Sequence, residues 1–262
     1  MKIVFRQNID ASDVIQESID LGSTDERAVA SLINAEGRNT VEAWFVAETD
    51  FSSTMTIVRN TALLEANYDR IAVSGSTTQA HEIVDASGHK ALRTGRYRYD
   101  FSRQGATDWT VAAVIQLGNV ADAANTSVFG WAPGATGTNQ PSLNITGTGS
   151  IRSFMSANQT TGVISVAGAI PNIKTQPYLI VISQSRTRGA FCRVNGVTVY
   201  SNAFANGKAP STGTSVSFLG SDVLSAAFDG LMFETILCNE DITADEYKLR
   251  AVEGYLMRKF GL

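Results

Sequence analysis

Residues 190–200 read AFCRVNGVTVY, and this stretch holds the strongest local signal for β-structure in the chain. Runs of β-branched and aromatic residues lie on both sides of Asn195-Gly196. That dipeptide supplies the positive φ angles of a type I′ turn at little energetic cost. The pattern therefore predicts a tight antiparallel hairpin with strands at 190–194 and 197–201.

Further runs of the same kind lie on both sides of this hairpin, and each is bounded by Gly, Pro or Asn. Short, regularly spaced runs rich in β-branched and aromatic residues are typical of an antiparallel β-sandwich. We expect strands at 109–117, 127–131, 142–146, 162–167, 178–183 and 215–219.

The distribution of charge supports this interpretation. Residues 1–108 hold 11 Lys or Arg and 16 Asp or Glu, whereas residues 109–239 hold only 6 and 4. The second stretch is rich in Ser, Thr, Asn and Gly, which suit the tight turns between strands. The chain therefore changes character near Trp109, and no helix of ordinary length is expected between 109 and 239.

The last twenty residues, 243–262, predict an amphipathic helix. Thr243 and Glu246 form a capping-box pair at its start, and Gly261 is placed to end it. Apolar residues recur at spacings of three and four, and we expect this stripe to pack on the sandwich rather than in the groove of a partner. The stripe consists of Tyr247, Ala251, Val252, Tyr255, Leu256 and Phe260.

The first 72 residues indicate a small mixed α/β segment. Strands are expected at 2–6, 41–47 and 54–59, and short helices at 12–21 and 24–36. From Val73 onward the chain is assigned to the sandwich, because polar residues alternate with aromatic ones over 96–101. The predicted organisation is an attachment or assembly segment at 1–72 and a mainly β sandwich at 73–262, which includes the terminal helix.

Bulk composition argues against several kinds of partner. A net charge of −4 lacks the basic footprint that nucleic-acid binding requires. No apolar run approaches the roughly 20 residues that cross a bilayer, and the first residues become polar too soon for a signal-peptide core. We therefore expect a protein made in a cytoplasm, with no membrane partner. Cys192 and Cys238 are expected to be buried thiols.

Several stretches in a fixed order resemble a known family. After the Asn-Gly hairpin come 218–220 (FLG), then 228–230 (FDG) leading into the strand GLMFETIL, then 242–243 opening the last helix. In this order they resemble the concanavalin A-like jelly rolls of tailed-phage structural proteins and of laminin-G-type modules. The resemblance covers residues 73–262 and implies a concanavalin A-like antiparallel β-sandwich.

Such jelly rolls include glycosidases, in which two carboxylates flank the sugar. No predicted strand between 109 and 239 has acidic residues at alternate positions, and Asp222, Asp229 and Glu234 are isolated in the sequence. His81 and His89 lie in a loop-like stretch rather than beside a nucleophile or base. We therefore expect no catalytic residues and no enzyme activity, and a glycan-active hydrolase or lyase is the least favoured hypothesis.

The resemblance to laminin-G-type modules also points to a metal ion. Laminin-G-type modules often hold Ca²⁺ at the sandwich edge, because this hard cation takes carboxylate and carbonyl oxygens. Asp122 and Asp222 are the loop candidates that the resemblance implies. Neither lies among other acidic residues, so a solvated loop aspartate is the favoured interpretation of each. Ca²⁺ is the one cofactor that the resemblance allows.

Two non-enzymatic hypotheses remain. The first is a virion surface protein of a tailed bacteriophage, a head decoration or tail attachment protein whose segment 1–72 docks to other virion proteins. The second is a carbohydrate-binding adhesin or lectin in which Trp131, Asn139 and Gln140, in a glycine-rich loop, bind host glycans; the alternative for Trp131 is burial under its own loop. The two overlap, since phage surface proteins also bind glycans. Open sheet edges further predict a homo-oligomer.

Overall fold

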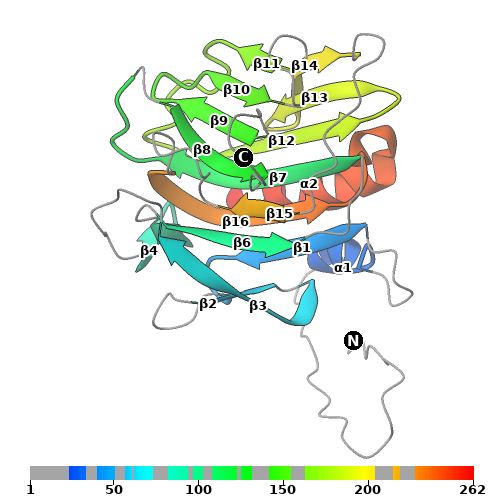
Figure 1. Ribbon diagram of the computed structural model, residues 1–262, viewed down its shortest axis with the longest axis horizontal. Coiled ribbons are helices and arrows are strands. Elements are labelled where there is room, and N and C mark those ends of the chain that lie inside the picture. The colour runs from blue at the N-terminus through cyan, green and yellow to red at the C-terminus, as the bar shows by residue number, and fades with distance from the viewer. Residues whose placement is uncertain are drawn as a thin grey trace, which may run out of the picture.

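Two antiparallel sheets pack face to face in the computed structural model (Figure 1). This arrangement confirms the predicted mainly β sandwich with a C-terminal helix. The structure describes residues 24–33, 40–50, 57–60, 62–72, 82–93, 97–102, 108–122, 125–131, 142–154, 163–203, 215–218 and 228–262.

The first sheet, called the helix-side sheet below, has eight strands. They are β1 (Val41–Val46), β4 (Glu82–Ala86), β5 (His89–Arg93), β7 (Trp109–Leu117), β12 (Tyr178–Ser185), β13 (Gly189–Val194), β14 (Val197–Asn202) and β16 (Gly230–Cys238). Their order is β14-β13-β12-β7-β16-β5-β4, and β1 also pairs with β16. The central strands β7, β12 and β16 are buried along almost their whole length, since both faces of this sheet are covered.

The second sheet, called the outer sheet, also has eight strands. They are β2 (Ile57–Asn60), β3 (Leu63–Ala72), β6 (Tyr97–Ser102), β8 (Asn125–Trp131), β9 (Ser142–Thr146), β10 (Ile151–Phe154), β11 (Val163–Val166) and β15 (Ser215–Phe218). Their order is β11-β10-β9-β8-β15-β6-β3-β2. Every expected strand between 109 and 219 is present in one of the two sheets, within two residues of its expected bounds.

The Asn-Gly hairpin forms as predicted. Asn195 and Gly196 have φ angles of 43° and 79°, and Val194 pairs with Val197 across the turn. A second tight hairpin joins β4 to β5, where Ser87 and Gly88 also have positive φ. The expectation of a loop-like stretch around His89 was therefore wrong. Ser-Gly is a weaker turn signal than Asn-Gly, which is why the sequence did not mark these strands.

Strands that precede residue 73 belong to the same two sheets. Trp44 of β1 pairs with Ile236 of β16, and Ile71 of β3 pairs with Arg98 of β6. The sandwich thus reaches back to Val41, further toward the N-terminus than the expected start at Val73. The strand expected at 2–6 and the helix expected at 12–21 lie outside the described residues. An attachment role for 1–72 stays a prediction.

The space between the sheets holds the larger core. Trp109 of β7 meets Phe129 of β8 edge to face, with ring centroids 5.5 Å apart. Phe45, Ile115 and Leu143 are also fully buried there. Each such side chain stabilises the fold by about 1.5–3 kcal/mol, so this layer fixes how the two sheets stack.

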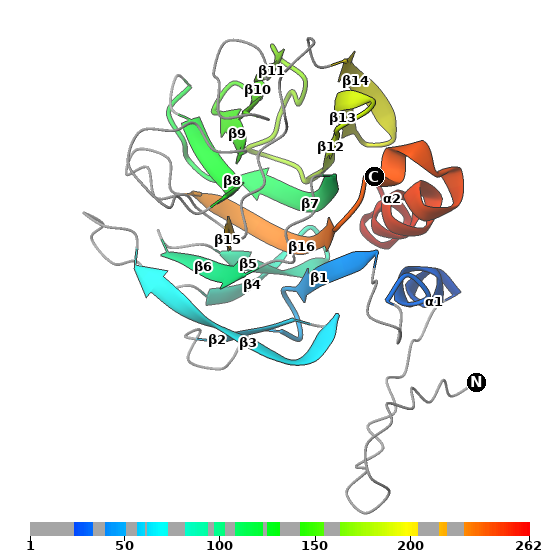
Figure 2. The ribbon, with the colours of Figure 1, turned by 45° about the vertical axis from the view of Figure 1, so that its right-hand side comes forward.

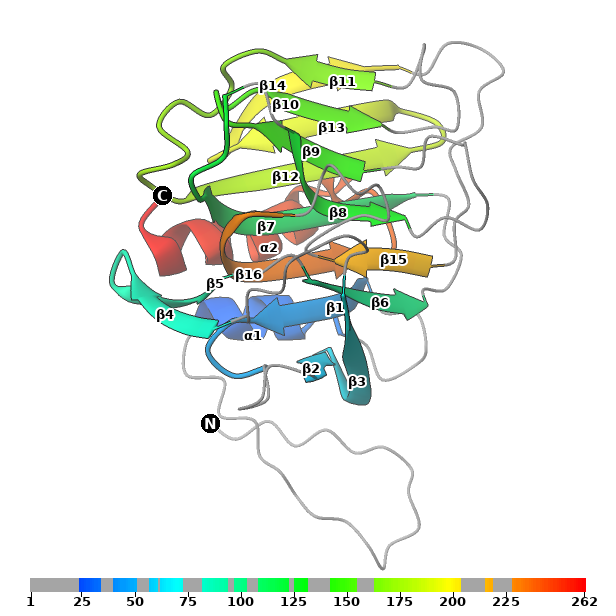
Figure 3. The same ribbon diagram turned by 60° about the vertical axis from the view of Figure 1, so that its left-hand side comes forward.

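A second apolar layer lies on the other face of the helix-side sheet. Helix α2 (Glu246–Phe260) covers that face (Figure 2). Its residues Val252, Leu256 and Phe260 belong to one apolar cluster with strand residues such as Val114. Helix α1 (Thr24–Ala30) lies beside α2 on the same face (Figure 3). The predicted packing of the terminal helix on its own domain is confirmed.

The start of the terminal helix differs from the expected capping box. Residues Ile242–Ala244 form a short 3-10 turn, η1, and Asp245 is the N-cap of α2, accepting hydrogen bonds from the amides of Tyr247 and Lys248. Tyr247 is 63% exposed and does not belong to the buried stripe. Gly261 ends the helix in the left-handed conformation, as predicted.

Two further observations concern the cysteines and the apolar length of the helices. Cys192 and Cys238 are both free and buried, as expected, and burial raises the pKa of the Cys192 thiol to about 12. Within the described ranges, no helix is both long and apolar enough to cross a membrane.

Candidate functional site

An open pocket of about 190 Å³ lies where the β4–β5 hairpin meets the last turn of α2. Its walls come from four elements far apart in the sequence: the end of β1, the β4–β5 hairpin, the middle of β16 and the end of α2. The lining includes Glu48, His89, Lys90, Phe233, Glu234 and Lys259. Aromatic rings and both signs of charge therefore meet in one concave site.

A β-bulge in β16 directs two successive residues to this pocket. Met232 pairs with Ile115, but Glu234 pairs with Val114, so Phe233 is the extra residue of the bulge. Met232 packs between the sheets, whereas Phe233 packs on the helix side and Glu234 reaches α2 on that same side. Bulges often re-aim side chains next to functional sites.

Glu234 is the buried centre of a hydrogen-bond network, called the Glu234 cluster below. Its Oε1 accepts from Trp44 Nε1 at 2.6 Å and its Oε2 accepts from Lys259 Nζ at 2.7 Å. Lys259 Nζ also lies 2.9 Å from the hydroxyl of Tyr255. A carboxylate with no exposed surface requires such partners, because an unpaired buried charge is very costly.

Burial and pairing act on the Glu234 carboxyl in opposite directions. Loss of hydration is the larger effect and leaves its pKa raised, although the ammonium of Lys259 and the hydrogen bonds from Tyr255 and Trp44 lower it. Burial, together with the charge of Glu234, raises the pKa of Tyr255, which stays a neutral hydroxyl. Lys259 is the charged member that faces the pocket, with 28% of its side chain exposed.

The rim of the pocket is the β4–β5 hairpin. Asp85 and Lys90, on opposite strands of the hairpin, form an exposed ion pair at 2.8 Å. His89 packs against Phe260 of α2 with ring centroids 4.8 Å apart, which ties the hairpin to the helix. The arrangement places hydrogen-bond donors and acceptors of both charges beside the aromatic side chains of Phe233 and Phe260.

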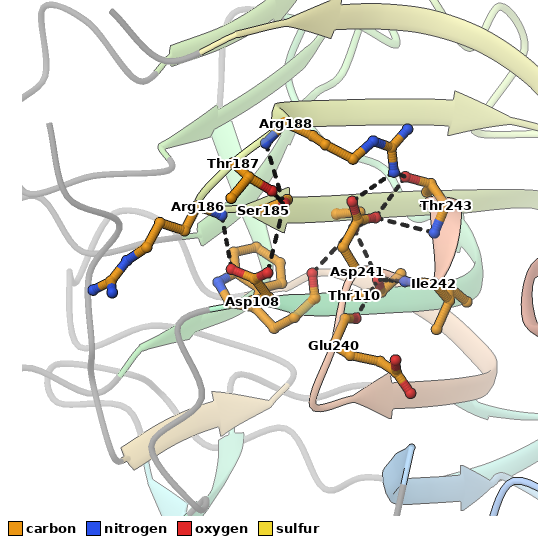
Figure 4. Close-up of polar contacts among 12 residues, drawn as sticks. Asp108, Thr110, Ser185, Arg186, Thr187, Arg188, Glu240, Asp241, Ile242 and Thr243 are labelled. Carbon is orange, nitrogen blue, oxygen red and sulfur yellow. Dashed lines mark hydrogen bonds and ion pairs between the residues drawn. The ribbon is translucent and has the colours of Figure 1, made fainter. Parts of the chain in front are cut away.

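A second polar network, the Asp241 cluster, lies where β16 leads into η1 (Figure 4). Asp241 Oδ1 accepts from Ser183 Oγ at 2.6 Å and from the amide and hydroxyl of Thr243 at 3.0 and 2.5 Å. Its Oδ2 accepts from Arg188 Nη1 at 2.7 Å. Thr110 Oγ1 bonds Ser183 and the Ile242 amide nearby.

The Asp241 cluster joins β7, β12, the β12–β13 turn and η1. Asp108 supports the same turn by accepting from the Arg186 amide at 2.7 Å. The Asp241 side chain is only 4% exposed, and four donors converge on its carboxylate. These contacts hold the C-terminal helix onto the sheet, whereas the pocket described above lies next to the Glu234 cluster.

The residues expected to bind sugar are Trp131, Asn139 and Gln140. Trp131 ends β8, where its backbone pairs with Val216 of β15. Asn139 and Gln140 lie outside the described residues. A binding role for these three stays a prediction.

One of the two calcium candidates, Asp122, lies in the described part of the fold. Asp122 is exposed and pairs with Lys174 Nζ at 2.9 Å, and Asp222 lies outside the described residues. Among the residues that the structure describes, no three His, Cys, Asp or Glu side chains gather as metal ligands would.

Sequence reasoning missed the pocket because it treated Glu234 and His89 singly. Glu234 is isolated in the sequence but lies against Lys259 and Trp44 in the fold. One signal was present: a lone glutamate in the otherwise apolar strand GLMFETILC. Charged residues are almost never fully buried without a partner, so this pattern indicates a buried ion pair without naming the cation.

No family model matches the chain, and no curated protein is similar to it in sequence. Solved structures of similar fold exist at low identity. Domain 4 of AbnA, an extracellular GH43 arabinanase from Geobacillus stearothermophilus, in complex with arabinotriose, has a TM-score of 0.57 at 12% identity; the match covers 81% of this chain and 98% of that domain.

Two further similar structures are matched over only part of their own length. A Trypanosoma rangeli sialidase has a TM-score of 0.56 at 12% identity, with 84% of this chain and 33% of the sialidase covered. The binding domain of botulinum neurotoxin DC, in complex with rat synaptotagmin II, has a TM-score of 0.56 at 6% identity, with 82% and 51% covered. The chain thus spans about a third of the sialidase and half of the toxin domain, and the likeness is one of fold.

Proposed function

We propose that this protein is a carbohydrate-binding β-sandwich that acts by recognition rather than catalysis, and that the pocket beside Glu234 is its binding site. The observation that carries the proposal is the composition of that pocket. Two ion pairs, Asp85–Lys90 and Glu234–Lys259, lie around aromatic side chains in one concave surface. Sugar hydroxyls both donate and accept hydrogen bonds, so paired donors and acceptors in a concave surface suit them.

The fold comparisons support the recognition role. The arabinanase domain was solved with arabinotriose, and the toxin fragment is a binding domain. At 6–12% identity this likeness concerns architecture, and fold alone is a weak warrant for function. Hence the proposal depends on the pocket.

Binding without catalysis is favoured by the state of the pocket's buried carboxylate. Glu234 is neutralised by Lys259 and held by Trp44, so it lacks the open position that a nucleophile or proton donor requires. The other two pocket carboxylates, Glu48 and Asp85, are exposed to water. The virion location expected from the sequence remains a prediction.

The test is a glycan array with the full chain, followed by calorimetric titration of the sugars that bind. Glu48→Ala and Lys90→Ala are expected to weaken binding by about tenfold or more each, because each removes a polar contact at the rim. Glu82→Ala is the matched control: Glu82 pairs with Arg93 on the same hairpin and does not line the pocket.

Three outcomes are distinguishable. Weakened binding in the pocket variants, with Glu82→Ala unchanged, supports the proposal. Binding lost in Trp131→Ala and retained in the pocket variants would move the site to the loop expected from the sequence. A folded protein that binds no glycan would overturn the proposed function.

A further inference from the structure

The charged residues that line the pocket beside Glu234 narrow the chemical class of its ligand. Resting on the proposed function, we infer that the ligand is a neutral sugar that presents two neighbouring hydroxyls to the Asp85–Lys90 pair and to Lys259. The charged side chains that line the pocket disfavour the binding of acidic sugars and of amino sugars.

Acidic sugars meet an excess of negative charge. Three carboxylates line the pocket, Glu48, Asp85 and Glu234, against two ammonium groups, Lys90 and Lys259. Each ammonium already has a carboxylate partner, at 2.8 Å for Lys90 and 2.7 Å for Lys259. A ligand carboxylate would therefore have to displace a protein carboxylate from its partner, while Glu48 repels it.

Cationic ligands are disfavoured for a different reason. Aromatic faces attract cations, but Lys259 already lies over the rings of Tyr255 and Phe260, with Nζ 5.3 and 5.6 Å from their centroids. A ligand ammonium would have to compete with Lys259 for these rings. Its own charge would also lie close to Lys259 and Lys90.

A neutral pair of hydroxyls matches the hydrogen-bond donors and acceptors that remain available in the pocket. Each hydroxyl both donates and accepts, and the Asp85–Lys90 pair offers an acceptor and a donor side by side. The two side chains are 80% and 43% exposed, so both can bond a ligand without moving. Lys259 bonds Glu234 and Tyr255 and has a third N–H for the ligand.

The test uses three methyl glycosides that share one neutral hexose framework: the parent sugar, its uronate and its 2-amino form. Each is titrated into the full chain by calorimetry at low salt and again at high salt. The parent is expected to bind about tenfold or more tightly than either charged form, with little dependence on salt, because no net charge is neutralised. Tighter binding of the uronate or the amino sugar would overturn this inference and leave the proposed function standing.

A double-mutant cycle locates the hydroxyl contacts. Asp85→Ala, Lys90→Ala and the double variant are compared for affinity toward the parent sugar. Losses that are not additive, with the double variant about as weak as either single one, support a shared diol contact. The matched cycle on Glu82 and Arg93, an exposed pair on the same hairpin, is expected to leave affinity unchanged. Equal losses in both cycles would overturn the contact, and absence of binding to every sugar would overturn the proposed function instead.

Discussion

The Glu234 cluster and the Asp241 cluster each stabilise a carboxylate that is buried at or just beyond strand β16. Glu234 has no exposed side-chain surface and Asp241 has 4%. Each is paired with one cation from another element, Lys259 of α2 or Arg188 of the β12–β13 turn. Both clusters therefore fasten the C-terminal region to the helix-side sheet.

They differ in what surrounds the carboxylate. Asp241 accepts from two hydroxyls, a backbone amide and a guanidinium, which come from three chain segments. Glu234 depends on the ammonium of Lys259 for its charge balance, and Lys259 faces the open pocket. Because the carboxylate of Asp241 is surrounded by hydrogen-bond donors, the Asp241 cluster acts as a structural junction between chain segments. At Glu234 the balancing charge comes from a single ammonium that lies at the wall of the pocket.

The largest effect is expected for Asp241→Ala, which tests whether this cluster is structural. It removes the acceptor of four hydrogen bonds and leaves buried donors unpaired, so we expect a loss of about 4 kcal/mol in the free energy of unfolding, measured in urea. Asp245→Ala, which removes only the cap of α2, is the control and is expected to cost about 1 kcal/mol. A loss no larger than that of the control would show that the junction is not needed.

Lys259→Met tests the charge balance of the Glu234 cluster. Lys259 lowers the pKa of Glu234, so its removal lets burial raise that pKa further. Below the ordinary value of 4.5 the carboxyl is protonated in both folded and unfolded states and costs little. As pH rises above 4.5 the unfolded state ionises first. The variant should therefore lose stability progressively, to about 3 kcal/mol at pH 7.

Urea unfolding between pH 4 and pH 8 measures this slope. The control is the double variant Glu234→Gln with Lys259→Met, which has no titrating group at this position and should lose the extra pH dependence. If the double variant kept the dependence of the free energy of unfolding on pH, that dependence would come from another titrating group.

Trp44→Phe is a smaller test of the same cluster. The ring and its edge contact with Tyr255 are kept, but the donor to Glu234 is lost. A hydrogen bond to a charged group contributes about 1.5–3 kcal/mol, and we expect a loss near 1.5 kcal/mol at pH 7 by urea unfolding. The loss should shrink at pH 4, where Glu234 is protonated. An equal loss at both pH values would mean that packing, not the hydrogen bond, is responsible.

Arg250→Ala gives the reference for an ion pair without burial. Arg250 pairs with Glu246 one turn away on α2, and both side chains are more than 70% exposed. Such pairs contribute about 0.5 kcal/mol or less, so thermal and urea unfolding should be almost unchanged. A loss comparable to that of Lys259→Met would remove the distinction between buried and exposed pairs in this protein.

The local elements were predictable from the residues that form them. Asn195-Gly196 requires positive φ at two positions and adopts it, and the β-branched runs at 109–117 and 178–183 form strands β7 and β12, as expected. Gly261 ends the last helix for the same local reason. The N-cap was misplaced by two residues, because Asp245 competes with Thr243 for the role and Asp241 engages the Thr243 hydroxyl.

The candidate site was not predictable in the same way. Its charged pairs join Asp85 to Lys90 across a hairpin whose turn gives a weak signal, and Glu234 to Lys259 across 25 residues. The β-bulge that turns Phe233 and Glu234 to one face leaves no distinct mark in the sequence. A period of two alone would have placed these neighbours on opposite faces.

The residues alone were thus enough to predict most of the strands between 109 and 219, the Asn-Gly turn, the amphipathic helix and the class of sandwich, because these depend on backbone preference and apolar spacing within a few residues. Only the tertiary structure decided that β1 joins β16, that the two hairpin strands before Arg93 complete the helix-side sheet, and which cation neutralises Glu234. Such choices depend on contacts between distant segments, where burial makes an unpaired charge costly and leaves one partner within reach.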